Sequence, residues 1–262
     1  MPQDGYLTRA GARISYQLNG SGSPLGYAHG VLLSRAAVRG LDLFDFDQLA
    51  GEHRLLTYDQ RGHGRSTGRP VPEDYRFEHL AQDLLALMDE AGFDEPMDIA
   101  GSSLGCAAAL YAALAAPQRF RRLVLMIPPA AWDTDGTPAR QWYHDTADRI
   151  ETRGAPAWLD EWAHADPLPI FADHPQFGFT PDVPNDLLAP VLHGVALDDL
   201  PPLTDLATLS HPTLILAWDT DPLHPVSTAQ RLAEHLPNST LWVAHSVDDI
   251  QTWTDRVAAF CR

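Results

Sequence analysis

Short apolar runs alternate with amphipathic stretches along most of the chain. Six runs of four to six residues, several of them containing β-branched side chains, predict buried strands at Leu25–Ala28, Leu55–Tyr58, Met97–Ala100, Leu123–Ile127, Thr213–Trp218 and Thr240–Ala244. The first 20 residues alternate apolar and polar positions in a way that predicts an antiparallel hairpin. These patterns indicate a protein built around a sheet.

Helical periodicity fills the intervals between the runs. Apolar residues recur at helical spacing in Asp74–Ala91, Ser227–Leu236 and Asp248–Phe260, while Leu104–Ala116 is small and apolar on every side. Strands that alternate with helices predict an α/β fold, with a mostly parallel sheet covered by helices on both faces. In such sheets the ligand lies at the carboxyl ends of the strands, which is where we expect the functional residues.

The segment 131–210 breaks this alternation. It holds 10 of the 22 prolines and four of the seven tryptophans, and it shows no strand-like run. Short helices are predicted at Ala139–Glu151 and Ala157–Ala165, joined by proline-rich loops. We expect a helical lid inserted between two strands of a core that is made of 1–130 and 211–262. A cap that only packs on the sheet is the alternative.

Composition narrows the classes of function and of partner. The chain of 262 residues is long enough for one large domain that folds without disulfides or metal. Its 18 basic and 35 acidic residues give a net charge of −17, which argues against nucleic acid and anionic membranes as partners. All 18 basic residues are arginine, so Schiff-base lysine chemistry is excluded. The oligomeric state is left open.

The cysteine count and the lack of a visible leader or membrane-span pattern predict the cellular compartment. Two cysteines, Cys106 and Cys261, are too few for a disulfide framework. No secretory leader pattern is visible, and no apolar stretch approaches the roughly 18 residues of a membrane span. We therefore expect a cytoplasmic protein.

The pentapeptide GSSLG at 101–105 lies between a predicted strand and a predicted helix. It is a G-x-S-x-G motif in a strand–turn–helix context, where a tight turn projects the central serine and the glycines let neighbouring backbone pass. The helix that follows directs its first N–H groups and its positive dipole end toward a developing oxyanion. We expect Ser103 to be a nucleophile and the Leu104 N–H to belong to an oxyanion hole. The neighbouring Ser102 does not occupy the central position of the motif. The alternative interpretation is a tight turn in which the serine has no catalytic role.

Two further loops follow predicted strands. After the run LGYA, the turn HGV at 29–31 offers the Val31 N–H as a second oxyanion donor. After the next run comes the glycine-rich segment YDQRGHGRS at 58–66, whose charged and histidine side chains at first suggest catalysis. We interpret them instead as a structural network that braces neighbouring loops.

These three stretches resemble, in order and spacing, those of the α/β-hydrolase superfamily. The resemblance covers nearly the whole chain, including the helical insertion, which is similar to the lid of that family. It implies an eight-stranded, mostly parallel sheet with a lid after the sixth strand, and a serine–acid–histidine triad in that chain order. Within the family the chain resembles small esterases and lactonases such as the 3-oxoadipate enol-lactonases. Cofactor-free perhydrolases and carbon–carbon bond hydrolases are similar too.

The resemblance also points to an acid after the run PTLILA. The segment WDTDPLHP is similar to the family's G-x-x-D-x-x-x-P, which selects Asp221 over Asp219 and puts Trp218 where glycine is usual. Asp133 and Asp135, which follow the sixth predicted strand, are the fallback acids.

The histidine of the triad is less well defined. The family usually places it in a loop after the last strand, whereas here the run STLWVA leads directly into His245. We predict His245 as the base because, of the histidines after Asp221, it alone sits at the carboxyl end of a strand. His224, three residues beyond Asp221, is the rival base, and His235 lies on a predicted helix. A site without a working base is the remaining alternative.

The expected chemistry follows from these residue types. A serine hydroxyl needs an adjacent base to attack a carbonyl carbon, and the acid orients the imidazole. We expect a serine hydrolase that uses no cofactor and cleaves an ester or lactone of a small to medium, apolar or aromatic substrate through an acyl-enzyme. The candidate substrate-binding residues are His29, Trp132, Trp142, Trp218 and His224.

Two other classes of function stay open at this point. Carbon–carbon bond hydrolysis or perhydrolysis would use the same triad, and a binding or rearrangement protein would use the same scaffold with an incomplete triad. Metal sites are not expected, because the 12 histidines show no H-x-x-x-H or H-E-x-x-H spacing and the cysteines are isolated.

Overall fold

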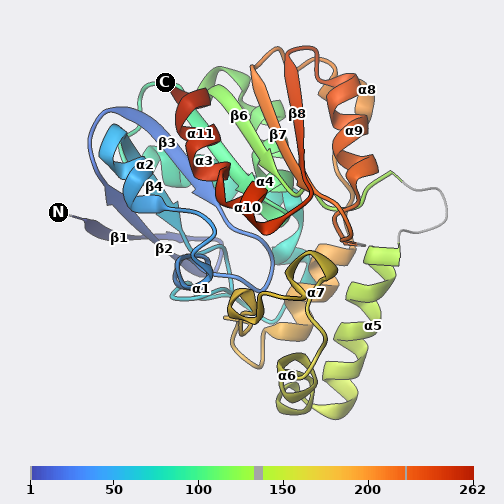
Figure 1. The fold of residues 1–262 in the computed structure, drawn as a ribbon. Coiled ribbons are helices and arrows are strands. Elements are labelled where there is room, and N and C mark those ends of the chain that lie inside the picture. The colour runs from blue at the N-terminus through green and yellow to red at the C-terminus, as the bar shows by residue number, and fades with distance from the viewer. Residues whose placement is uncertain (1, 133–137, 222) are drawn as a thin grey trace.

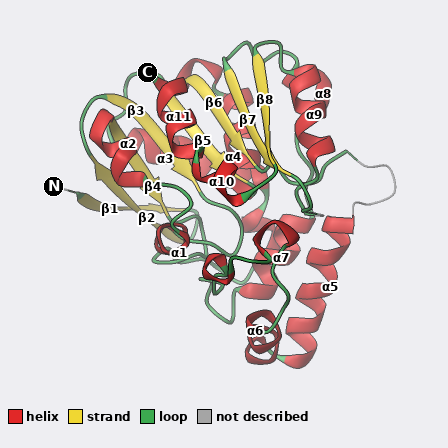
Figure 2. Ribbon diagram, in the orientation of Figure 1, coloured by secondary structure: helices red, strands yellow, loops and turns green. Residues whose placement is uncertain are grey.

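An eight-stranded sheet forms the centre of the computed structural model, which describes residues 2–132, 138–221 and 223–262 (Figures 1 and 2). The strand order is β1-β2-β4-β3-β5-β6-β7-β8. Each predicted run corresponds to a strand. The strands are β1 (Gln3–Arg9), β2 (Ala12–Asn19), β3 (Ser23–Ala28), β4 (His53–Tyr58), β5 (Met97–Ser102), β6 (Phe120–Met126), β7 (Thr213–Trp218) and β8 (Ser239–Ala244).

Strand direction divides the sheet into a hairpin and a parallel part. β1 and β2 form the predicted antiparallel hairpin, with Arg9 opposite Ala12. The two turn residues, Ala10 and Gly11, have φ values of 44° and 76°, as a two-residue hairpin turn requires. β2 pairs antiparallel with β4, and every further neighbour in the order is parallel. The predicted α/β fold with a mostly parallel sheet is confirmed.

Helices cover both faces of the sheet (Figure 2), and the strand side chains alternate between two cores. In β6, Leu123 and Leu125 belong to the core under α3, α4 and α9, while Val124 and Met126 belong to the core under α2, α10 and α11. The helices outside the segment 131–210 are α1 (Arg35–Leu41), α2 (Phe46–Glu52), α3 (Phe77–Glu90), α4 (Leu104–Ala115), α9 (Val226–His235), α10 (Val247–Gln251) and α11 (Trp253–Cys261).

Between β6 and β7 the described part of the chain forms helices and loops. Figure 1 shows α5, α6 and α7 gathered beneath one end of the sheet. The elements of this segment are α5 (Pro138–Arg153), α6 (Ala155–Ala163), α7 (Leu188–Ala196) and α8 (Leu203–Leu206), with short 3-10 helices η3 (Pro169–Phe171) and η4 (Pro175–Phe177). The fallback acids Asp133 and Asp135 lie outside the described residues.

Backbone hydrogen bonds identify the end of the sheet that this segment covers. The Asp182 N–H donates to the Leu32 carbonyl at 2.9 Å, and the Asp182 carbonyl accepts the Gly64 N–H at 2.8 Å. Both partners lie in loops that leave parallel strands at their carboxyl ends, so the segment stands over the edge where functional residues are expected. Its role as a lid stays a prediction.

Some helices differ from the sequence prediction. The short helices α1 and α2 were not predicted; they depend on caps, with Ser34 accepting the Ala37 N–H and Asp45 accepting two N–H groups. α7 was not predicted either, and it is buried along most of its length. The predicted helix Asp74–Ala91 is divided into the 3-10 helix η1 (Pro72–Tyr75) and α3, and Asp248–Phe260 into α10 and α11. Among the described residues, no helix combines the length and apolarity needed to cross a bilayer.

The start of α4 lies very close to the sheet. A Cβ added at Gly105 would overlap the carbonyl oxygen of Ala28 in β3, and one added at Gly101 would overlap the carbonyl oxygen of Gly105. The two glycines of the GSSLG motif therefore let α4 begin directly against the sheet, which fixes Ser103 between them.

Replacing Gly105 by alanine tests this close approach. We expect Gly105→Ala to lower the free energy of unfolding by about 3 kcal/mol, because β3 is paired on both sides and cannot move away. Gly51→Ala is the matched control: in α2 an added Cβ meets nothing within 4 Å. Because alanine has a higher helix propensity than glycine, the free energy of unfolding of Gly51→Ala should rise by about 0.5–1 kcal/mol. Urea unfolding measures both variants, and equal stabilities would contradict the packing argument.

Candidate functional site

Ser103 occupies the sharp turn between β5 and α4. Its backbone has φ 51° and ψ −111°, a conformation that L-residues rarely adopt. The carbonyl of Met126 on the neighbouring strand holds the turn by accepting the Ser103 N–H at 3.0 Å and the Cys106 thiol at 3.1 Å. The serine is thereby fixed at the carboxyl end of β5.

One hydrogen bond joins Ser103 to the loop after β7, and a second continues it within that loop. The Oγ of Ser103 lies 2.8 Å from Nε2 of His224, and Nδ1 of His224 lies 2.6 Å from Oδ2 of Asp221. An ionised carboxylate only accepts hydrogen bonds, so Nδ1 carries the proton and donates it to Asp221. Nε2 is then the acceptor of the Ser103 hydroxyl. The serine therefore faces an imidazole that is oriented to receive its proton.

Asp221 is a buried carboxylate that accepts three hydrogen bonds. Besides the contact with His224, Oδ1 accepts the Leu223 N–H at 2.9 Å and Oδ2 accepts the indole N–H of Trp218 at 3.1 Å. Burial acts to raise the pKa of Asp221, but the hydrogen bond and charge of His224, aided by Leu223 and Trp218, outweigh it and hold that pKa below its ordinary value. The acid is ionised at neutral pH.

His245 lies elsewhere, and its prediction as the base beside Ser103 is wrong. Its Nδ1 contacts Oδ2 of Asp219 at 2.7 Å, and its side chain is 70% exposed. β8 is the edge strand, three strands from β5, which puts the two strands roughly 14 Å apart. Because α10 begins at Val247, the chain after β8 has too few residues to carry the imidazole back across the sheet.

The sequence contains a signal against a catalytic loop after β8. Ser246 caps α10 by accepting the Asp249 N–H at 3.2 Å. A serine followed three residues later by an acidic residue is typical of a helix N-terminus, so it predicts that no long loop follows His245. His224 has a signal of its own, because a spacing of three residues within one loop lets its ring reach back to Asp221.

The glycine-rich loop after β4 forms structural contacts, in agreement with its interpretation as a bracing network. The carboxylate of Asp59 accepts the Arg35 N–H at 2.9 Å, the Arg35 guanidinium at 3.1 Å and the Arg65 N–H at 3.0 Å. Arg61 is buried and donates two hydrogen bonds to Asp83 of α3, at 3.0 and 2.8 Å. The loop is thus tied to α1 and α3.

His29 is also structural, which corrects its prediction as a substrate-binding residue. Its ring is buried, with Nδ1 at 2.8 Å from the Gly30 carbonyl and Nε2 accepting the Gln60 N–H at 2.8 Å. Burial lowers the pKa of His29, so the ring is neutral. It holds the turn that leads to Val31, and this turn lies beside the serine: a Cβ added at Gly30 would stand 3.4 Å from Cβ of Ser103.

The three tryptophans predicted to bind substrate lie in different surroundings. Trp218 is buried and donates to the acid described above, so it does not form a free pocket wall. Trp132 is half-buried, and its indole N–H donates to the Pro201 carbonyl at 2.9 Å. Trp142 is half-buried and packs edge-on against Tyr143, with ring centroids 5.2 Å apart. Contacts of Trp132 and Trp142 with substrate stay predictions.

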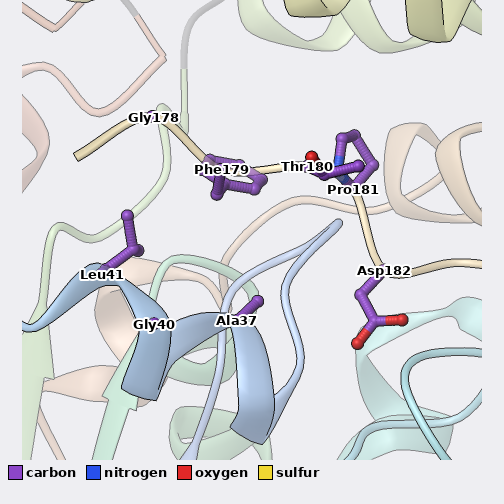
Figure 3. Close-up of a pocket in the computed structure, with 8 residues that line it drawn as sticks. All are labelled: Ala37, Gly40, Leu41, Gly178, Phe179, Thr180, Pro181 and Asp182. Atoms are coloured by element: carbon purple, nitrogen blue, oxygen red, sulfur yellow. The ribbon is translucent and has the colours of Figure 1, made fainter. Parts of the chain in front are cut away.

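A cavity of about 370 Å³ lies between α1 and the segment 178–182 (Figure 3). In Figure 3 the side chain of Leu41 on α1 and that of Phe179 come from opposite walls. Asp182 closes one side, where its carboxylate accepts the Ser34 hydroxyl at 2.5 Å. A volume of this order suits a small molecule. The lining residues are Ala37, Gly40, Leu41, Gly178, Phe179, Thr180, Pro181 and Asp182.

One group of described residues brings metal-ligand side chains together on the surface. Asp148 and Glu151 of α5 and His193 of α7 have ligand atoms within 4.8 Å of one another. Nε2 of His193 lies 3.6 and 3.5 Å from the two carboxylates, so the group also forms ion pairs when His193 is protonated. Both acids are exposed. The expectation from the sequence that the chain has no metal site stays a prediction.

Comparison with known proteins places the chain among hydrolases. A family model described as the alpha/beta hydrolase fold matches residues 27–159, just over half of the chain. RutD, a proposed carbamate hydrolase from Caulobacter vibrioides, is 28% identical over 267 aligned positions that cover 94% of each chain. The 3-oxoadipate enol-lactonase 1 of Acinetobacter baylyi is 26% identical over 244 positions, which cover 87% of this chain and 83% of the relative.

A solved structure shows the same architecture along nearly the whole length. A hydrolase from Pseudomonas aeruginosa PA01 has a TM-score of 0.78 and 25% identity, and the match covers 98% of this chain and 97% of that one. The family model spans Ser103 but ends before Asp221 and His224. The arrangement of Asp221 and His224 beside Ser103 therefore rests on the hydrogen bonds of the site and not on that match.

His63 is a buried neutral histidine next to His29, with ring centroids 5.3 Å apart. Its Nδ1 lies 2.8 Å from the Arg61 carbonyl, to which it donates, and among the described residues its Nε2 has no hydrogen-bond partner. Burial lowers the pKa of His63 from 6.5 to about 3. Below pH 6.5 His63 binds a proton in the unfolded chain but stays neutral in the folded protein. Acidification therefore favours unfolding.

We expect His63 to account for about 2 kcal/mol of the unfolding free energy lost between pH 7 and pH 5. In His63→Asn the amide replaces the imidazole as the donor to the Arg61 carbonyl. The unfolding free energy that this variant loses between pH 7 and pH 5 is smaller by about 2 kcal/mol. His164→Asn is the control, because the side chain of His164 is 77% exposed. Chemical denaturation at both pH values provides the measurement. Equal losses in wild type and His63→Asn would contradict this assignment.

Proposed function

Because the chain belongs to the α/β hydrolase family, we propose that it is a serine hydrolase that cleaves an ester or lactone through the triad Ser103, His224 and Asp221. The observation that carries the proposal is the continuous pair of hydrogen bonds, 2.8 and 2.6 Å long, from the serine to the acid. A base within hydrogen-bond reach of a nucleophile, oriented by a third group, is what this chemistry needs. His224 takes the role that sequence analysis gave to His245.

In the first half-reaction the Oγ of Ser103 attacks the carbonyl carbon of the substrate. Nε2 of His224 accepts the hydroxyl proton as the new C–O bond forms, and the charge of Asp221 stabilises the imidazolium. The imidazolium then gives this proton to the leaving alcohol as the ester C–O bond breaks. The acyl group remains on Ser103.

In the second half-reaction a water molecule takes the place of the alcohol. His224 removes a proton from the water, whose oxygen attacks the acyl carbon, and then returns the proton to Oγ as Ser103 leaves. The carboxylic acid is released and the serine is restored. Every proton in the cycle passes through one imidazole, so the scheme requires no cofactor.

The negative charge on the carbonyl oxygen requires donors next to Ser103, and we assign this role to the N–H groups of Leu104 and Val31. Leu104 is the first residue of α4, where N–H groups have no acceptor within the helix and the dipole end is positive. Val31 follows Gly30, where an added Cβ would stand 3.4 Å from Cβ of Ser103, and this closeness supports a donor on that side. Donors held in this way favour the charged intermediate.

We propose a small to medium, largely apolar substrate. The four tryptophans of the segment 131–210 support this choice. The cavity of about 370 Å³ is lined by Leu41, Phe179 and Pro181 but by no residue of the triad, so the choice does not rest on it. A carbamate is the second candidate, because similarity to RutD extends over 94% of the chain. A carbamate has a carbonyl that the same serine attacks.

The other classes of function are distinguished by the site or by the substrate. Carbon–carbon bond hydrolysis and perhydrolysis use the same triad, so only a choice of substrates separates them from ester hydrolysis. The alternative of a binding or rearrangement protein was motivated by the displaced position of His245. It loses that support because His224 lies between Ser103 and Asp221.

Alanine variants of the triad and of the rival histidine test the proposal. We expect Ser103→Ala and His224→Ala each to lower kcat/KM for an aryl ester by about 10⁴-fold. His245→Ala is the matched control and keeps its activity within about twofold, since an exposed ion pair such as that with Asp219 contributes little. Initial rates with an aryl ester, a lactone and an aryl carbamate measure these effects. Faster turnover of the carbamate would favour the second candidate.

Labelling with a fluorophosphonate probe, followed by intact mass, separates the chemistry from the choice of substrate. Wild type and His245→Ala should gain the mass of one probe, and Ser103→Ala should gain none. Labelling that survives in His224→Ala but is lost in His245→Ala would reverse the assignment of the base. A wild type that resists the probe would contradict an activated serine.

A further inference from the structure

Trp218 ends β7 at the position where the family resemblance leads one to expect glycine. Its indole Nε1 donates a 3.1 Å hydrogen bond to Oδ2 of Asp221, the same oxygen that accepts the proton of His224 Nδ1. The residue is 9% exposed, so water does not compete for this contact. One carboxylate oxygen is thus shared by the imidazole and the indole.

Aromatic packing on two sides fixes the orientation of the indole. Trp253 of α11 stacks on Trp218 with centroids 5.6 Å apart and an interplanar angle of 18°. Phe171 of η3 meets Trp218 edge-on, at 5.4 Å and 82°. Rotation of the indole about its side-chain bonds would disrupt both contacts. The N–H is therefore held toward Asp221.

We propose that Trp218 is a positioning residue for the triad, whose indole N–H fixes the carboxylate of Asp221 in the orientation that faces His224. This inference rests on the proposed function, in which Asp221 is the acid. The Leu223 N–H holds Oδ1 at 2.9 Å, so three donors define the plane of the carboxylate. Without the indole N–H, Oδ2 has His224 as its one remaining donor among these three.

Loss of the indole N–H affects both members of the acid–base pair. A carboxylate with fewer donors is less firmly oriented, so the imidazole is aligned with Ser103 for less of the time. The charge on Oδ2 is also less shared, which favours the protonated imidazole of His224 and moves the acid limb of the pH–rate profile to higher pH.

A further titratable side chain among the described residues acts on this carboxylate. Tyr143 of α5 interacts electrostatically with Asp221, and burial raises the pKa of Tyr143 well above its ordinary value. The tyrosine therefore stays neutral throughout the acid limb. A shift of that limb reports on the hydrogen bonds of Asp221 and not on a change of charge at Tyr143.

Two tryptophan-to-phenylalanine variants separate the N–H from the ring. Trp218→Phe keeps an aromatic ring between Trp253 and Phe171 but removes the donor to Asp221. Trp253→Phe makes the same chemical change in the stacked partner, whose Nε1 has no hydrogen-bond partner among the described residues. Both variants lose the same atoms, but only the first loses a hydrogen bond.

For hydrolysis of an aryl ester we expect the kcat of Trp218→Phe to be about tenfold lower than that of wild type, with KM within about twofold. Its acid limb moves to higher pH. Trp253→Phe keeps the wild-type kcat and profile. A role of Trp218 in packing alone predicts similar small changes in both variants and an unmoved acid limb, and that result would overturn the inference.

Proton NMR gives a readout that does not require turnover. The Nδ1 proton between His224 and Asp221 should give a low-field resonance that shifts and exchanges faster with water in Trp218→Phe, and stays unchanged in Trp253→Phe. If wild type hydrolyses no ester while this resonance responds, the proposed function fails and the positioning role stands. A resonance that is the same in both variants overturns the positioning role, whatever the protein hydrolyses. Thermal unfolding of each variant confirms that it is folded.

Discussion

A buried carboxylate needs hydrogen-bond donors around it. The carboxylate of Asp221 is buried, and the rest of the site is arranged around it. A charge in a residue that is 5% exposed would be strongly destabilising without partners. Three donors, from Leu223, Trp218 and His224, surround it and fix the loop after β7. The imidazole of His224 has one nitrogen committed to the acid, so its other nitrogen is directed at Ser103.

The parallel sheet positions Ser103 relative to the loop after β7. β5 and β7 end at the same edge of the sheet with β6 between them. The end of β6 contacts both sides: the Met126 carbonyl accepts the Ser103 N–H, and shortly afterwards the Ala130 N–H donates to the Leu223 carbonyl at 3.1 Å. Three consecutive strand ends therefore hold the serine and the imidazole within hydrogen-bond distance.

Features that depend on local pattern could be predicted from the sequence, and features that depend on tertiary geometry could not. Periodicity located the strands, and the GSSLG motif located Ser103 in its turn. His245 has a suitable residue type at a strand end, but it follows an edge strand and is succeeded at once by a helix. His29 and Trp218 stand in motifs that suggest contact with substrate, whereas burial directs their polar atoms to backbone groups and to Asp221.

The acid and the base of the proposed triad both belong to the short loop between β7 and α9. Within the triad, a displacement of this loop changes the separation from His224 to Ser103 and leaves the acid–base pair together. The length of the loop is therefore a constraint of its own: an insertion or deletion between Asp221 and His224 would change the three-residue spacing by which the imidazole reaches its acid. The exposed His245 after β8 contacts Asp219 and no residue of the triad, so a substitution of His245 leaves the hydrogen bonds of the triad in place.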